Sequence, residues 1–151
     1  MRRLLLSIAL GAALVSTAFA QTTAQPDLSG TWKLNLAKSK LDKQHKIKSQ
    51  TIAITAAGDT IQFHDSADAK DDVYTFIPDG KERPFGIWDE NNDSVVKATW
   101  ENSVLVIETT IRSGAQVLIH TIDRWSLSSD GKMLLLDPNS NGKLSFVYDK
   151  H

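Results

Sequence analysis

The chain has 151 residues, with 17 lysine and arginine side chains against 18 acidic ones, and it contains no cysteine. A net charge of −1 gives no basic surface field, which excludes the usual electrostatic basis for nucleic-acid binding. Without cysteine the chain has no disulfides and must be held together by packing within one domain, the natural number for this length.

Residues 1–20 have the three parts of a secretory signal peptide: two arginines, an apolar run from Leu4 to Val15, and small residues before a cleavage point near Ala20. The run is too short for a membrane-spanning helix, which needs roughly 20 apolar residues. We therefore expect export to the periplasm or the extracellular space, without a membrane anchor, because no cysteine follows that could be lipidated. A flexible leader is expected at 21–27 and a single β-barrel domain at 28–151.

From Gly30 onward, apolar and polar residues alternate with a period of two, which is typical of β-strands with one buried face. About ten short segments follow this pattern: 31–36, 50–56, 60–64, 73–77, 84–88, 94–100, 104–111, 115–127, 133–137 and 143–149. Turn sequences such as Asp130-Gly131 and Asn141-Gly142 lie between most of them and favour tight hairpins. The pattern predicts an all-β, antiparallel up-and-down meander, and hence a barrel or a sandwich.

The stretch 37–48 is the least strand-like part of the domain. It is rich in lysine and contains only Leu41 and Ile47 as large aliphatic residues. We expect at most one short helical turn here. Two interpretations remain open, a lid over the mouth of a barrel or a solvated connector.

The first predicted strand opens with Gly30-Thr31-Trp32. A closed meander needs its first strand to meet its last and needs one end of the barrel to be filled. An indole provides a large apolar surface for that end, and Gly30 permits a close approach where a side chain would collide. We therefore predict that Gly30 and Trp32 have a structural role in closing the barrel.

The opening SGTWKLN resembles the Gly-x-Trp motif of the calycins, the group that contains the lipocalins and the fatty-acid-binding proteins. The wider pattern resembles secreted bacterial lipocalin-like proteins: Lys38-Ser39-Lys40, the DGK turns at 79–81 and 130–132, and the terminal Val147-Tyr148-Asp149-Lys150. This resemblance implies a calycin-type β-barrel.

The chain departs from those families at the residues that carry their activity. Fatty-acid-binding proteins insert two helices after the first strand, whereas 37–48 is too short for such a pair. They also hold the ligand carboxylate with Arg-x-Tyr in the last strand, where this chain has Phe146 two residues before Tyr148. Lipocalins place an arginine near the C-terminus, and no arginine follows Arg124 here. Their ligand contacts therefore do not transfer residue by residue.

No motif for catalysis, metal binding or cofactor binding is present. The four histidines are scattered, and the chain lacks Cys-x-x-Cys, Gly-x-Ser-x-Gly and a glycine-rich phosphate loop. We expect no metal and no cofactor, and an enzymatic activity would require carboxylates that folding brings together.

Candidate ligand-binding residues are aromatic residues near strand ends and polar residues within apolar strands: Tyr74, Phe76, Trp88, Trp100, Glu108, His120, Arg124 and Tyr148. Core packing is the alternative role for the aromatic members of this set. The strand at 115–127 has two possible orientations. If its Leu118 face is interior, His120 and Arg124 enter the barrel; if its Trp125 face is interior, as we favour, they lie outside.

The sequence thus suggests an exported β-barrel that binds a small apolar or amphipathic molecule. We expect no nucleic-acid partner, and a monomer is favoured although the sequence leaves the oligomeric state open. A barrel filled by its own side chains is the alternative, acting as a structural or interaction module of the cell envelope. The observation that suggests this alternative is the strand at 104–112, which is largely apolar on both faces. A third interpretation of the sequence is an enzyme with its active site in the barrel lumen.

Overall fold

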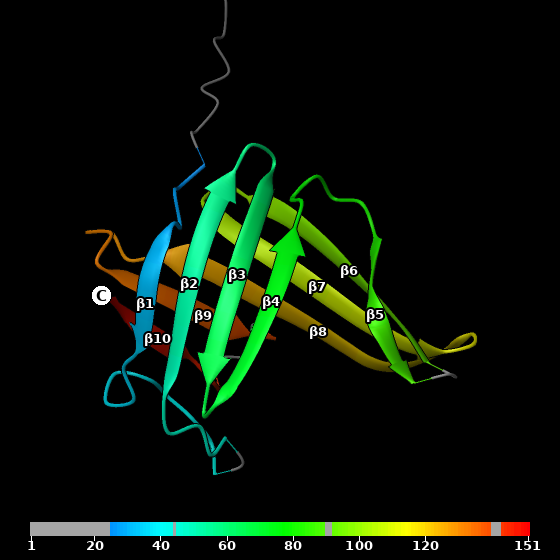
Figure 1. The fold of residues 1–151 in the computed structure, drawn as a ribbon, viewed down its shortest axis with the longest axis horizontal. Helices are drawn as coiled ribbons and strands as arrows, with labels where there is room; N and C mark the ends of the chain where they lie inside the picture. The colour runs from blue at the N-terminus through cyan, green and yellow to red at the C-terminus, as the bar shows by residue number, and fades with distance from the viewer. Residues whose placement is uncertain (1–24, 44, 90–91, 140–142) are drawn as a thin grey trace, which may run out of the picture.

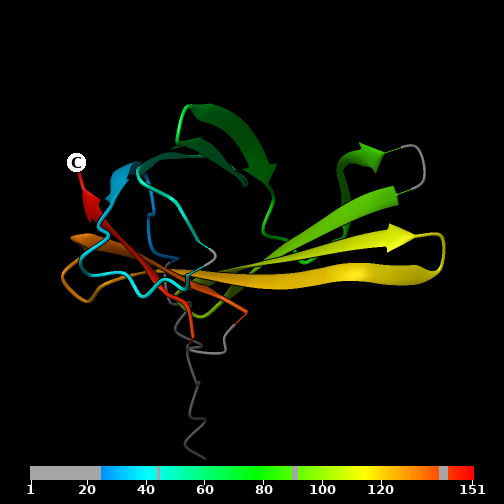
Figure 2. The same ribbon diagram turned by 90° about the horizontal axis from the view of Figure 1, so that it is seen from below.

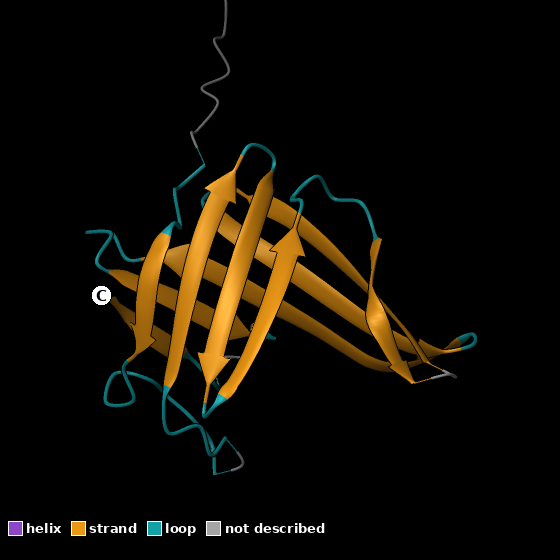
Figure 3. Cartoon of the chain, viewed as in Figure 1, coloured by secondary structure: helices purple, strands orange, loops and turns teal. Residues whose placement is uncertain are grey.

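The structure, a computed structural model, describes residues 25–43, 45–89, 92–139 and 143–151. The predicted signal peptide at 1–20 and most of the leader at 21–27 lie outside the described residues. The strands are β1 (Gly30–Leu34), β2 (Gln50–Ala57), β3 (Thr60–Ala67), β4 (Lys70–Phe76), β5 (Arg83–Asp89), β6 (Asn92–Glu101), β7 (Val104–Ser113), β8 (Gln116–Leu127), β9 (Met133–Pro138) and β10 (Phe146–Lys150). Figure 3 shows strands and loops but no helix in the described part of the chain. The predicted all-β, ten-stranded architecture is confirmed.

All ten strands belong to one antiparallel sheet with the order β4-β3-β2-β1-β10-β9-β8-β7-β6-β5. The first strand meets the last, with Trp32 opposite Lys150 and Leu34 opposite Tyr148. The sheet curls so that β2–β4 lie in front of β6–β9 in Figure 1, and Figure 2 shows the two layers edge-on. The strands β4 and β5 are the two ends of the order, so the hydrogen-bonded ladder is interrupted between them. The chain therefore forms a curled, incompletely closed barrel.

The connector between β1 and β2 contains turns but no helix in its described residues. The backbone amides of Lys38 and Ser39 both donate to the Asn35 carbonyl, at 3.2 and 3.0 Å. Further along, Leu41 and Ile47 are half-buried against the core, so the connector is more than a solvated loop. The absence of a helix among these described residues agrees with the expectation of at most one short helical turn near 37–48.

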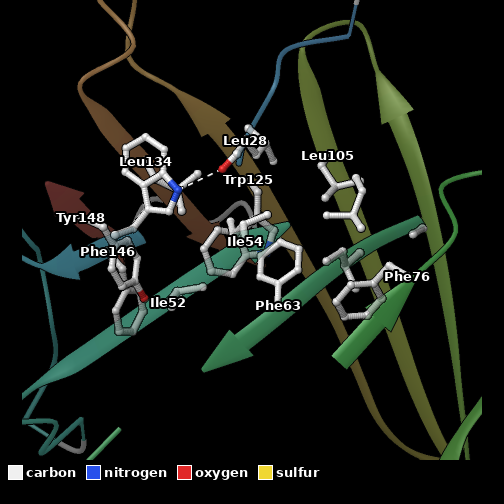
Figure 4. Close-up of a cluster of buried hydrophobic side chains, with 14 of the residues drawn as sticks. Leu28, Ile52, Ile54, Phe63, Phe76, Leu105, Trp125, Leu134, Phe146 and Tyr148 are labelled. Atoms are coloured by element: carbon white, nitrogen blue, oxygen red, sulfur yellow. Dashed lines mark hydrogen bonds between the residues drawn. The ribbon is translucent and has the colours of Figure 1, made fainter. Parts of the chain in front are cut away.

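Trp32 fills one part of the interior and is fully buried. Its indole Nε1 donates to the backbone carbonyl of Leu28 at 2.9 Å, the dashed line in Figure 4, so the polar edge of the ring is satisfied inside the core. At Gly30 the backbone φ is +142°, and a Cβ would lie 3.3 Å from the Cε of Lys150 on the partner strand. The conformation favours glycine there, and a Cβ would in addition require the lysine side chain to shift by a few tenths of an ångström.

The alternation along each strand sets which side chains enter the barrel. On β8 the Trp125 face is interior, because Trp125 is buried and packs against Phe63 and Tyr148 in the cluster drawn in Figure 4. The preferred orientation of this strand is thereby confirmed. Beyond the layer formed by β1–β4, the far ends of β7 and β8 continue outward (Figure 1), and Val117, Leu118 and Ile119 are exposed there.

Within the described residues, no helix has the length and apolar character needed to cross a membrane.

Candidate ligand-binding cavity

A cavity of about 290 Å³ lies inside the curled sheet. Its walls combine apolar and aromatic side chains with a small number of polar ones, contributed by eight strands from both layers. The lining residues are Gln50, Ile52, Phe63, Asp65, Tyr74, Phe76, Phe85, Ile107, Thr109, Asp123, Trp125, Leu136 and Tyr148. Such a mixture is typical of small-molecule sites, in which a few polar groups orient a mostly apolar ligand.

Aromatic rings form a continuous wall of this cavity. Phe63 packs edge-on against both Trp125 and Phe76, with ring centroids 5.2 and 5.5 Å apart. Tyr74 and Phe85 stack at 5.5 Å and join β4 to β5, where no backbone hydrogen bonds do so. The interruption of the ladder is therefore closed by side chains, which can move more readily than a hydrogen-bonded strand pair.

The polar lining begins with a hydrogen-bonded chain of three side chains. The Tyr148 hydroxyl donates to Gln50 Oε1 at 2.9 Å, and Gln50 Nε2 donates to both carboxylate oxygens of Asp65 at 2.8 Å. Burial raises the pKa of the Asp65 carboxyl, while the Gln50 hydrogen bond opposes that rise. The pKa of the Tyr148 hydroxyl lies far above its ordinary value, chiefly through burial and then through the charges of Asp65 and Asp123.

Asp123 is the second acidic group of the lining. Burial alone raises the pKa of its carboxyl to about 6. No hydrogen bond or ion pair from another described residue reaches this carboxylate, so nothing offsets the cost of its burial. At neutral pH the cavity therefore contains an unpaired negative charge.

The charge of the cavity is one-sided. Among the residues that the structure describes, its lining includes Asp65 and Asp123 and no lysine, arginine or histidine. A third carboxylate, that of Asp72, lies close enough to raise the pKa of Tyr74, after the larger effect of burial. The interior is thus apolar and aromatic, with an acidic polar side.

Three of the eight predicted ligand-binding residues meet in this cavity: Tyr74, Phe76 and Tyr148. Trp100 is half-buried and lines a separate hollow with Leu28 and Ile61 at another part of the barrel. Trp88 belongs to β5, but its side chain lies outside the described part of the structure.

The other three predicted residues, Glu108, His120 and Arg124, lie on the outer face of β7 and β8 and do not line the cavity. There they form surface ion pairs. Lys97 and His120 flank Glu108, with His120 Nε2 at 2.9 Å from its Oε1, and Arg124 Nη1 donates to Glu101 Oε2 at 2.7 Å. These pairs explain how charged residues fit into strands that are otherwise apolar.

The sequence interpretation missed the polar lining residues Gln50, Asp65 and Asp123. The alternation of side chains along a strand could have identified the two aspartates, because Asp65 shares a face with Phe63, and Asp123 shares one with Trp125. Once an aromatic residue is assigned to the interior, the polar residue two positions away follows it inside.

No group of three or more His, Asp or Glu side chains within the described ranges could hold a metal ion. The two lining carboxylates could exchange protons with a bound molecule, but no nucleophile is paired with a base among the lining residues. The chemistry that the cavity supports directly is non-covalent binding.

Neither protein-family models nor curated proteins give a match to this chain. Solved structures do. A fatty-acid-binding protein 1 of Echinococcus granulosus shares 17% identity at a TM-score of 0.58, covering 82% of this chain and 96% of its own. Lipid binding protein 8 of Caenorhabditis elegans shares 18% at 0.61, covering 82% and 94%. Human cRBP IV shares 17% at 0.60, covering 83% and 99%. At such identities the likeness establishes a shared fold, the calycin-type β-barrel.

Proposed function

We propose that this protein is an exported binding protein that holds a small apolar or amphipathic molecule in its barrel. The observation that carries the proposal is the cavity of about 290 Å³ with an aromatic wall. The fold supports it, since structural neighbours are named for binding fatty acids and lipids.

The size and lining of the cavity suit a small ligand. Ligand pockets typically measure roughly 300–1,000 Å³, so this one lies at the small end of the range. Contact with Phe63, Phe76 and Trp125 would remove apolar ligand surface from water, at roughly 25 cal/mol per Å². The stacked pair of Tyr74 and Phe85 between β4 and β5 offers a path of entry that breaks no backbone hydrogen bond.

Export is the part of the proposal supported by residues 1–20 alone. Fractionation of cells that express the full chain should recover it outside the cytoplasm. N-terminal sequencing of the recovered protein should begin at Gln21. A cytoplasmic protein that retains its first residues would contradict export.

Binding is tested with a neutral apolar fluorophore, N-phenyl-1-naphthylamine, titrated into the protein. Thr109 lines the cavity, so Thr109→Phe should fill it and weaken binding by about tenfold or more. The matched control Thr75→Phe adds the same ring on the exposed face of β4 and should leave affinity unchanged. Absence of binding to the wild type, or equal binding by Thr109→Phe, would contradict the proposal.

The alternative, an interaction module of the envelope, is favoured by one surface. The outer-face residues Val106 and Thr110 are buried within the chain itself, so the two-sided apolar pattern of β7 needs no partner. Val117, Leu118 and Ile119, however, are 42–52% exposed on consecutive positions of β8. Site-specific crosslinking from position 118 in the expressing cell tests this reading: a reproducible protein adduct supports it, and a chain that stays uncrosslinked contradicts it.

A further inference from the structure

The polar side of the cavity is acidic, and this bears on the kind of molecule that it accepts. The two charged lining residues, Asp65 and Asp123, come from opposite layers of the barrel, on β3 and β8. Both charges act on Tyr148, since both raise the pKa of its hydroxyl. Asp65, Asp123 and Tyr148 all line the same cavity.

We propose that the ligand has a cationic amine headgroup that pairs with Asp123 and Asp65, with its apolar portion against the aromatic wall. This inference rests on the proposed binding function and names the ligand class for the same cavity.

Asp123 provides the first argument. Asp123 is half-buried, its carboxylate is desolvated enough to raise its pKa, and it has no hydrogen-bond or ion-pair partner among the described residues. A buried charge without a partner is costly, and an opposite charge of a ligand would relieve that cost upon binding. An ammonium group supplies both the charge and several N–H donors.

Asp65 provides the second argument for a cationic ligand. Its partner Gln50 is in turn held by the Tyr148 hydroxyl, so the side chain is oriented by hydrogen bonds rather than free to turn away. In this series of hydrogen bonds the hydroxyl donates to the amide oxygen and the amide N–H donates to the carboxylate. An ionised Asp65 carboxylate can only accept hydrogen bonds, so the series fits its ionised form. A fixed carboxylate beside an aromatic surface is a suitable partner for an amine, which aromatic faces also attract.

The same arrangement disfavours anionic ligands. A carboxylate in this lumen would face like charges at Asp65 and Asp123, and no described lining residue is basic and could balance them. The basic residues of the outer face, Lys97 and Arg124, are engaged with Glu108 and Glu101. Fatty-acid anions should therefore be poor ligands, in spite of the fold.

The test compares three ligands of equal chain length that differ in headgroup charge: octylamine, octanol and octanoate. Each displaces N-phenyl-1-naphthylamine from the full chain at about pH 7.5, where the amine is charged. Octylamine should bind about tenfold more tightly than octanol, and octanoate more weakly than both. Equal or tighter binding of octanoate would overturn the inference.

Variants assign the preference to the two carboxylates. Asp123→Asn and Asp65→Asn each remove a charge with little change in shape and should reduce the preference for octylamine over octanol toward unity. Glu108→Gln removes a carboxylate from the outer face and should leave the preference intact. An amine preference that survives both cavity substitutions would place the cation elsewhere and overturn the assignment.

The pH dependence is a second readout. Asp123 should gain a proton as the pH falls through about 6, and the octylamine preference should fall with it. The other titratable groups that line this part of the lumen among the described residues are Asp65, Tyr74 and Tyr148, and Asp72 lies opposite Asp65 on the neighbouring strand. Failure of the two proposals is distinguishable: binding of octanol without an amine preference removes only the ligand class, whereas no binding of the fluorophore or of any octyl compound removes both.

Discussion

Asp123 shows how one residue can work against stability while serving a site. Its carboxylate occupies an interior position between apolar neighbours, and burial raises its pKa from 3.8 to about 6. A raised carboxyl pKa means that the folded state binds the proton more tightly than the unfolded state does. The charged form therefore lowers stability above about pH 6, and this cost disappears below about pH 4, where both states are protonated.

We predict that Asp123→Asn stabilises the protein at neutral pH. The expected gain in the free energy of unfolding is about 1–3 kcal/mol at pH 7, declining toward zero near pH 4. Urea denaturation at a series of pH values measures it. Asp59→Asn, which removes an exposed carboxylate, is the matched control and should show no comparable pH-dependent gain. A destabilised Asp123→Asn at pH 7 would mean that the carboxylate has a stabilising partner.

Residue by residue, the sequence identified the aromatic part of the site better than the polar part. Tyr74, Phe76 and Tyr148 were predictable because large aromatic residues in alternating strands have few places other than the interior. Asp65 and Asp123 were missed, because an acidic residue in a strand is assigned to the solvent face by default, even where it shares a face with an aromatic residue. The interior face of β8 was predicted from Trp125, and the packing of this ring against Phe63 of β3, a contact between distant segments, confirms it.

At the scale of the elements, all ten strands were predicted, and the differences are confined to their ends. The ladder of β4 begins at Lys70 rather than near Val73, because the charged residues at its start hide the alternation. The ladder of β10 begins at Phe146 rather than at Lys143. Ser145 instead forms an isolated bridge with Lys40, and so links this end to the connector after β1. Alternation marks a strand only where one face is apolar.

The β3–β4 hairpin illustrates a turn that the sequence concealed. Ala67 pairs with Lys70, so Asp68 and Ala69 form a two-residue turn, and both have positive φ, +43° and +72°. Such turns normally contain glycine or asparagine, and neither is present here. Asp68 is held by the backbone amides of Lys48 and Ser49, at 3.1 and 3.0 Å, which compensates part of the conformational cost.

We predict that Ala69→Gly stabilises this hairpin. Alanine at a left-handed position is strained by roughly 1 kcal/mol, and glycine is not, so the free energy of unfolding should rise by about 0.5–1 kcal/mol. Thermal and urea unfolding measure the change. The control Ala57→Gly makes the same chemical substitution at an exposed strand position and should lower stability by a similar amount. Equal effects of the two substitutions would show that the left-handed conformation of Ala69 carries no strain.

For the whole molecule, the joining of β1 to β10 was predictable and the interruption between β4 and β5 was not. Alternation defines faces but does not determine whether two strands pair. The segment that connects β4 to β5 pairs with β6 instead: Gly80 N donates to Ala98 O at 2.9 Å, and Asp79 forms a β-bridge with Thr99. Stacked rings of Tyr74 and Phe85 close the remaining gap. The chain has no disulfide, and hydrogen bonds join the sheet at β1 and β10 but not at β4 and β5. The barrel therefore depends on its interior contacts.

Trp32 should therefore matter for the whole barrel rather than for β1 alone. It is fully buried, donates to the Leu28 carbonyl, and lies on the one strand that joins β2 to β10. Replacing it with alanine removes a large apolar surface and leaves that carbonyl without its donor. We predict a loss of about 3–5 kcal/mol in the free energy of unfolding for Trp32→Ala, and a smaller loss for Trp32→Phe, which keeps most of the packing.

Urea unfolding followed by far-ultraviolet circular dichroism should show a single, shifted transition, because β1 belongs to both adjoining ladders. Trp100→Phe, at a half-buried position, is the control and should cost less than Trp32→Phe. A loss below about 1 kcal/mol for Trp32→Ala would show that the barrel does not depend on this residue for its closure.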